Sequence, residues 1–144
     1  MSVANILSVK GREVVTVRPK ETVEKIVHLL AEKRIGAVIV TDAHGHIAGI
    51  VSERDVVRHM ALDGSALLAK SIDSIMTKKV MTCNDADSEQ ELMALMTAHR
   101  IRHLPVVKDG KLAGMISIGD VVKHRIEAIE REAEDMKAYI ASAG

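Results

Sequence analysis

The strongest constraint on the fold is that the chain repeats itself. Residues 46–57 (HIAGIVSERDVV) align with residues 111–122 (KLAGMISIGDVV), and six of the twelve positions are identical. Matches such as Thr16 with Thr82 extend the repeat upstream. Half of a 144-residue chain is marginal when folded alone, so two such units must bury surface against each other. The sequence therefore predicts two copies of one small fold with a shared core.

Each unit shows the same order of local patterns. A short β-rich run is followed by a one-sided helical pattern, which begins after Thr22 in the first unit and after Ser88 in the second. Two strands joined by a turn come next, and a second helix begins near Glu53 and near Ile118. The order is β-α-β-β-α in each unit. This order predicts an α+β fold in which the two units are related by pseudo-twofold symmetry.

The repeat also divides the chain into three parts. We assign residues 1–63 to repeat 1 with its N-terminal segment, 64–79 to a connector, and 80–144 to repeat 2 with an extended C-terminal helix. This helix carries apolar residues at alternating spacings of four and three, from Val122 to Ile140, which is typical of a coiled-coil seam. The seam either packs on its own domain or binds a second copy. We favour a homodimer, because the helix extends well beyond the repeat.

Composition excludes several classes of function. Lys+Arg and Asp+Glu are both 20, whereas binders of nucleic acid carry a basic excess. There is one Tyr and no Phe or Trp, so bases have no aromatic platform on which to stack. No apolar run is long enough to span a membrane. The single cysteine cannot form an internal disulfide, which favours a reducing cytoplasm. No metal-ligand spacing or catalytic motif is present, so we predict neither a metal site nor an enzyme.

A Ser-x-x-Asp motif lies where a strand becomes a helix in both units, as Ser52 with Asp55 and as Ser117 with Asp120. The motif can serve as a capping box that stabilises the helix. It can also bind a ligand, because a carboxylate at a helix N-terminus can accept hydrogen bonds from the two hydroxyls of a ribose. The residues alone leave both interpretations open.

The repeated motif resembles that of a tandem pair of CBS domains, the regulatory module named after cystathionine β-synthase, of the stand-alone bacterial and archaeal type. Residues 49–55 (GIVSERD) and 114–120 (GMISIGD) match the family pattern Gly-h-h-Ser/Thr-x-x-Asp, where h is hydrophobic. Residues 102–107 (RHLPVV) look like the start of the family's second strand, whereas the first unit lacks the proline. The resemblance implies clefts between the units that bind AMP, ADP, ATP, NAD(H) or S-adenosylmethionine, with the Asp on the ribose.

Candidate ligand-binding residues flank the predicted strands and the two motifs. Without aromatic residues, aliphatic side chains and strand backbone must hold the base. Arg54 and Arg102 are the preferred phosphate ligands among several nearby cations, which include Lys10, Arg12, Arg34, Arg100 and Lys123. Ordinary strand core and solvated surface charge are the alternatives at most positions. The candidate set is Thr16, Val17, Gly36, Ala37, Ser52, Arg54, Asp55, Thr82, Cys83, Arg102, His103, Leu104, Pro105, Ser117, Gly119 and Asp120.

These observations predict a regulatory CBS pair that senses an adenine nucleotide (AMP, ADP, ATP or NAD(H)) as a sign of energy state and modulates a partner protein. A ligand-free scaffold dimer, in which the motifs only cap helices, is the alternative. The motifs also differ in charge, with Glu53 and Arg54 in one and Ile118 and Gly119 in the other. We therefore expect the two clefts to differ in affinity by at least tenfold, or ~1.4 kcal/mol.

Overall fold

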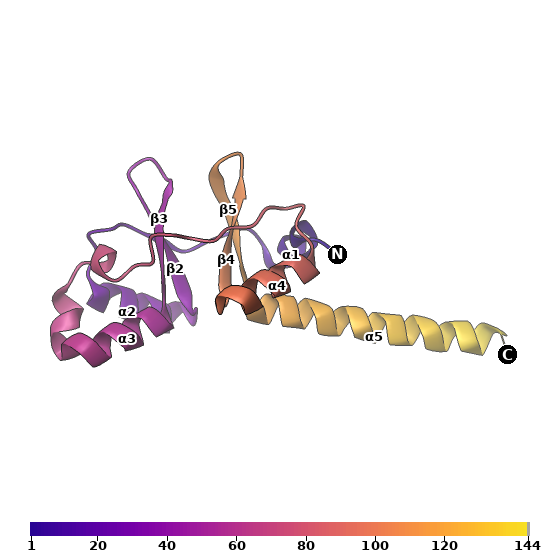
Figure 1. The fold of residues 1–144 in the computed structure, drawn as a ribbon. Coiled ribbons are helices and arrows are strands. Elements are labelled where there is room, and N and C mark those ends of the chain that lie inside the picture. Colours follow the sequence, from indigo (N-terminus) through magenta and orange to yellow (C-terminus); the bar gives the residue numbers. More distant parts are fainter. Residues whose placement is uncertain (144) are drawn as a thin grey trace.

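Two units of the same build stand side by side in the computed structural model, which describes residues 1–143 (Figure 1). The first unit contains β1 (Thr16–Val17), α2 (Val23–Lys33), β2 (Ala37–Thr41), β3 (Ile47–Ser52) and α3 (Glu53–Asp63). The second contains α4 (Glu89–His99), β4 (His103–Lys108), β5 (Lys111–Ser117) and α5 (Ile118–Ala143). The predicted α+β repeat is confirmed.

Each unit is built around a small sheet. In the first, β1 pairs with β2 in parallel and β2 pairs with β3 in antiparallel fashion. In the second, β4 and β5 form an antiparallel pair. The expected first strand of this unit is reduced to a single parallel bridge between Cys83 and Val106. It stops there because Asn84 and Asp87 begin a turn in which their side chains accept backbone hydrogen bonds.

The first helix of each unit begins and ends in the same way. Thr22 caps α2 by accepting a hydrogen bond from the N–H of Lys25, and Ser88 caps α4 by accepting one from that of Glu91. Both helices end at an arginine, Arg34 or Arg100, in the left-handed conformation with φ of 53°. The local sequence therefore produces the same turn into the next strand twice.

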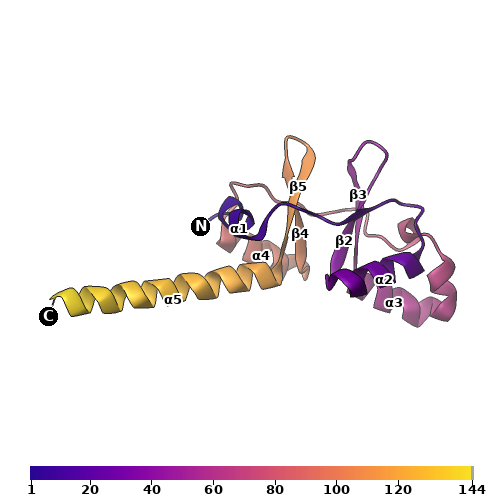
Figure 2. The same cartoon turned by 180° about the vertical axis from the view of Figure 1, so that it is seen from behind.

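The N-terminal helix α1 (Val3–Lys10) packs on the second unit. Val3, Ile6 and Leu7 are buried in one cluster with Leu92 of α4 and Leu104 of β4. Figure 2 shows α1 beside α4 and β5. The sequence division groups this segment with the first repeat, but its apolar face completes the core of the second.

The connector makes the reciprocal contact. It contains two short 3-10 helices, η1 (Gly64–Ala69) and η2 (Ile72–Ser74). Leu67, Ile72 and Ile75 are buried in the core of the first unit, together with Val23 and Ile26 of α2. The segment before each unit thus stabilises the other unit, and the chain passes between the units twice.

The last helix α5 leaves the body of the protein (Figures 1 and 2). Val121 and Ala128 are its buried residues. Its apolar side chains beyond the body are exposed by half or more, among them Ile129, Met136 and Ile140. The predicted long C-terminal helix is confirmed. In residues 1–143, no helix is both long and apolar enough to cross a bilayer.

Candidate functional site

A cavity of about 400 Å³ lies where the two units meet, and we call it the Asp55 cleft. Both units and the connector contribute to its walls. The lining residues are Gly36, Ile50, Ser52, Glu53, Arg54, Asp55, Arg58, Thr77, Lys79, Val80, Met81, His99, Arg100, Ile101, Arg102 and His103. Its volume is in the range of small-molecule sites.

Asp55 lies in this cleft at the N-terminus of α3 and forms the predicted capping box with Ser52. Its Oδ2 accepts hydrogen bonds from the N–H of Ser52 at 2.9 Å and from its hydroxyl at 3.1 Å. Among residues 1–143, no donor bonds to the other carboxylate oxygen, Oδ1. Capping therefore uses one oxygen of Asp55 and leaves the second available to a ligand.

Asp120 forms the same capping box with Ser117 but has a further partner. The Lys10 ammonium lies 2.5 Å from its Oδ2 and 2.7 Å from the carbonyl oxygen of Met115. Partial burial raises the pKa of Asp120, but hydrogen bonds from Lys10 and Ser117 outweigh burial and leave that pKa below its ordinary value. The chain thus places its own cation on the carboxylate of the second motif.

His103 lines the Asp55 cleft on the side of the second unit, and its close approach favours glycine at position 36. A Cβ on Gly36 would lie 3.0 Å from Glu53 Oε1 and 3.1 Å from His103 Cε1. Burial, followed by the charge of Lys10, lowers the pKa of His103. The imidazole is therefore neutral at pH 7 and contributes hydrogen-bonding nitrogens rather than charge.

A sequence model of the CBS domain matches residues 6–62 and 71–127. The chain belongs to the CBS domain family. Its two CBS domains account for most of the described elements.

Similar proteins support this assignment. The chain is 35% identical over 124 residues to the mitochondrial CBS domain-containing protein CBSX3 of Arabidopsis thaliana, a match that covers 83% of this chain and 60% of that protein. The chain thus spans less than two thirds of that relative. A CBS-domain protein of Agrobacterium tumefaciens has 47% identity and a TM-score of 0.85, covering 86% of this chain and 92% of that chain.

A third similar structure holds a ligand. A CBS domain protein from Pyrobaculum aerophilum, solved in complex with AMP, has 28% identity and a TM-score of 0.74. The match covers 83% of this chain and 89% of that chain.

The Asp55 cleft brings together six of the sixteen candidate residues: Gly36, Ser52, Arg54, Asp55, Arg102 and His103. Five others, Val17, Ala37, Cys83, Leu104 and Pro105, are buried in or beside the strands of the two CBS domains. Thr16 and Thr82 are exposed and do not line the cleft, and Ser117, Gly119 and Asp120 form the second motif.

The buried state of Cys83 determines its chemistry. Burial, together with the nearby Asp87 and Asp85, raises the pKa of its thiol to about 12. A thiol with such a pKa is protonated and inert at pH 7, so Cys83 serves as a small apolar core residue. Across residues 1–143, no three His, Cys, Asp or Glu side chains are grouped in a way that could hold a metal ion.

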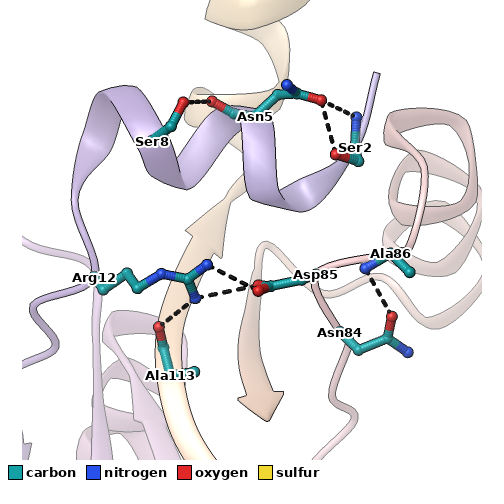
Figure 3. A network of polar contacts seen from close by, with 8 residues as sticks. All are labelled: Ser2, Asn5, Ser8, Arg12, Asn84, Asp85, Ala86 and Ala113. Atoms are coloured by element: carbon teal, nitrogen blue, oxygen red, sulfur yellow. Dashed lines mark hydrogen bonds and ion pairs between the residues drawn. The ribbon is translucent and has the colours of Figure 1, made fainter.

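Two other candidate cations are engaged elsewhere. Arg12 binds the carboxylate of Asp85 through both terminal nitrogens, at 3.1 and 2.8 Å, and donates to the carbonyl oxygen of Ala113 (Figure 3). Lys10 pairs with Asp120. Both residues therefore fasten the N-terminal segment to the second CBS domain.

Sequence reasoning missed most of the connector's contribution to the Asp55 cleft. Thr77 and Lys79 of the connector, with Val80 and Met81 directly after it, reach the first motif because the chain recrosses between the domains there. Paired backbone hydrogen bonds of Thr77 with Ile50 hold this crossing. No sequence pattern signals this crossing. Arg58 could have been found, since it lies one helical turn after Arg54 on α3 and shares its face.

Proposed function

We propose that this CBS pair is a regulatory protein that binds an adenine nucleotide (AMP, ADP, ATP or NAD(H)) in the Asp55 cleft and modulates a partner protein in response. The observation that carries the proposal is that Asp55, whose Oδ1 accepts no hydrogen bond within residues 1–143, lines an interdomain cavity of about 400 Å³. The AMP complex of the Pyrobaculum relative supports an adenosyl ligand for this fold.

The cleft offers a partner for each part of a nucleotide. Ile50, Val80 and Met81 supply aliphatic surface against which a purine can pack. The free oxygen of Asp55 accepts hydrogen bonds from ribose hydroxyls. Arg54 and Arg102 supply guanidinium groups, which suit phosphate oxygens.

The two motifs differ in availability, which supports unequal binding. Both carboxylates use only Oδ2 for capping, but Asp120 Oδ2 also accepts the Lys10 ammonium at 2.5 Å, whereas no cation within residues 1–143 pairs with Asp55. A ligand at Asp120 meets a carboxylate whose charge Lys10 already offsets. We therefore propose that the nucleotide prefers the Asp55 cleft by at least tenfold in affinity, about 1.4 kcal/mol.

The exposed apolar seam of α5 supports a homodimer as the form in which this module acts. Ile129 and Met136 are 50% and 59% exposed on a helix that has left the body of the protein. Such a seam is stabilised when a second helix covers it. A cytoplasmic location stays a prediction, based on the single buried cysteine.

Calorimetry with AMP and ATP tests the proposal on the wild type and on Asp55→Ala, with Asp120→Ala as the matched control. Both variants lose a capping box and about 0.5–2 kcal/mol of stability. A difference in nucleotide binding between them therefore cannot come from loss of the cap. We expect Asp55→Ala to abolish the tighter binding and Asp120→Ala to retain it.

Thermal melting supplies an independent measurement, because a ligand at 100 times its dissociation constant stabilises the folded state by about 2.7 kcal/mol. If no adenosyl compound changes the melting temperature, or if Asp55→Ala binds as the wild type does, nucleotide sensing is refuted. The Ser-x-x-Asp motifs would then only cap helices, as in the scaffold alternative.

A further inference from the structure

We propose that the ligand of the Asp55 cleft is an adenosine polyphosphate, ADP or ATP, in preference to a monophosphate or an adenosyl sulfonium such as S-adenosylmethionine. This inference rests on the proposed function and names the ligand class of the same site. Its basis is the charge of the cleft. Five cationic side chains line the cleft, Arg54, Arg58, Lys79, Arg100 and Arg102, against two carboxylates, Glu53 and Asp55.

These cations have no ionic partners within the protein. Across residues 1–143, none of the five has a carboxylate oxygen within 4.0 Å, so no ion pair offsets their charge. Like charges that share one cavity repel each other. An anion that carries several charges would relieve this repulsion, whereas one phosphate would balance only part of it.

The cations also come from three separate segments of the chain. Arg54 and Arg58 are one turn apart on α3, Lys79 comes from the connector, and Arg100 and Arg102 come from the turn between α4 and β4. Arg54 Nη1 lies 3.4 Å from the carbonyl oxygen of Arg100, so the groups from the two domains adjoin. Five cations drawn from three segments suit a chain of phosphates better than a single phosphate.

The internal repeat shows that part of this charge is not required by the fold. Arg58 and Arg100 correspond to Lys123 and Arg34, but the other three positions carry no cation in the other repeat. The position of Arg54 in the motif is occupied by Gly119 in the second unit. At the 66-residue spacing that relates Thr16 to Thr82, Lys79 corresponds to Glu13, a reversal of charge. Both units fold in the same way, so the cations at 54 and 79 belong to the function of one cleft.

Calorimetry with adenosine, AMP, ADP, ATP and S-adenosylmethionine tests the proposal, in a buffer with EDTA so that the phosphates keep their full charge. We expect affinity to rise from adenosine through AMP to ATP, with ATP at least tenfold tighter than AMP and S-adenosylmethionine weakest. Because charge drives the difference, raising the salt concentration should weaken ATP binding much more than adenosine binding.

Lys79→Glu, which introduces the residue of the equivalent position, should weaken ATP at least tenfold and leave adenosine within twofold. Lys78→Glu is the matched control, because it makes the same charge change at an exposed neighbour that does not line the cleft. Far-ultraviolet circular dichroism checks that both variants fold.

Equal affinities for AMP and ATP, or equal effects of the two lysine variants on ATP, would overturn the polyphosphate proposal and leave nucleotide sensing intact. Binding of inorganic tripolyphosphate without any nucleoside preference would instead overturn the adenosyl ligand. The absence of any binding would overturn both.

Discussion

Replacing Lys10 with Met should free the Asp120 carboxylate from its ion pair while it keeps most of the unbranched stem of the side chain. In the wild type, Lys10 Nζ lies 2.5 Å from Asp120 Oδ2 and 2.7 Å from the Met115 carbonyl oxygen. The two side chains are 35% and 24% exposed, so solvent screens the pair only in part. The variant removes this link between α1 and the second CBS domain without opening a cavity.

The size of the effect follows from this geometry. Two unit charges at this distance attract by about 1.7 kcal/mol even with the dielectric constant of water. Ordering the lysine side chain costs rotamer entropy, and this cost offsets part of the attraction. We expect Lys10→Met to lower the free energy of unfolding by about 1 kcal/mol at pH 7. For a chain of this length, that is a fall of about 3 °C in melting temperature.

The pH dependence separates the ion pair from a packing effect. The pKa of Asp120 in the folded protein is below its ordinary value, although burial raises it, because Lys10 and Ser117 donate hydrogen bonds to the carboxylate. A lowered carboxyl pKa stabilises the fold above the unfolded pKa, and this stabilisation is lost as the pH falls through the folded pKa. The difference between wild type and Lys10→Met should therefore be full at pH 7 and disappear in acid, as the pH falls through the lowered pKa of Asp120 in the folded protein.

Urea unfolding of wild type, Lys10→Met, Asp120→Asn and the double variant gives the coupling energy directly. Lys20→Met is the control, because Lys20 pairs with Asp73 at 2.9 Å but is 85% exposed, and it should have a smaller effect. A coupling energy below about 0.3 kcal/mol, or one unchanged between pH 7 and acid, would refute the reasoning. If Lys10 keeps ligand from the second motif, the variant should also gain a second class of nucleotide sites in calorimetry.

Three further predictions concern the core, the dimer and the cysteine. Leu7→Ala should lower the free energy of unfolding by about 2–5 kcal/mol in urea titrations, because Leu7 is buried in the core of the second domain. Val9→Ala, at an exposed position, should change this free energy little. Equal effects of the two variants would place α1 outside the core. Ile129→Glu should shift sedimentation toward the monomer, and Ala138→Glu, on the opposite face of α5, should not; if neither changes the mass, the seam does not join two copies. Cys83, with its pKa raised to about 12, should resist a thiol reagent at pH 8 until the protein unfolds, and rapid labelling of the native state would contradict its burial.

The repeat motif largely determined the prediction of the fold. Residues 46–57 and 111–122 carry the same hairpin strand, cap and helix start, and local propensity alone produces these elements. The Ser-x-x-Asp boxes formed as expected, because their hydrogen bonds are confined to four consecutive residues. The sequence also predicted the long C-terminal helix, since its apolar spacing persists over many turns.

The placement of α1 and of the connector was decided by the tertiary structure alone. Leu7 and Ile72 are apolar residues in weak local patterns, and either could have packed on its own unit. Only the assembled cores show that α1 packs in the second unit and that the connector packs in the first. This exchange carries Lys10 to Asp120 and Lys79 to the Asp55 cleft, so it sets the charges of both motifs. A sequence specifies local hydrogen bonds through neighbouring residues, whereas the pairing of residues 110 positions apart depends on how two apolar surfaces meet in space.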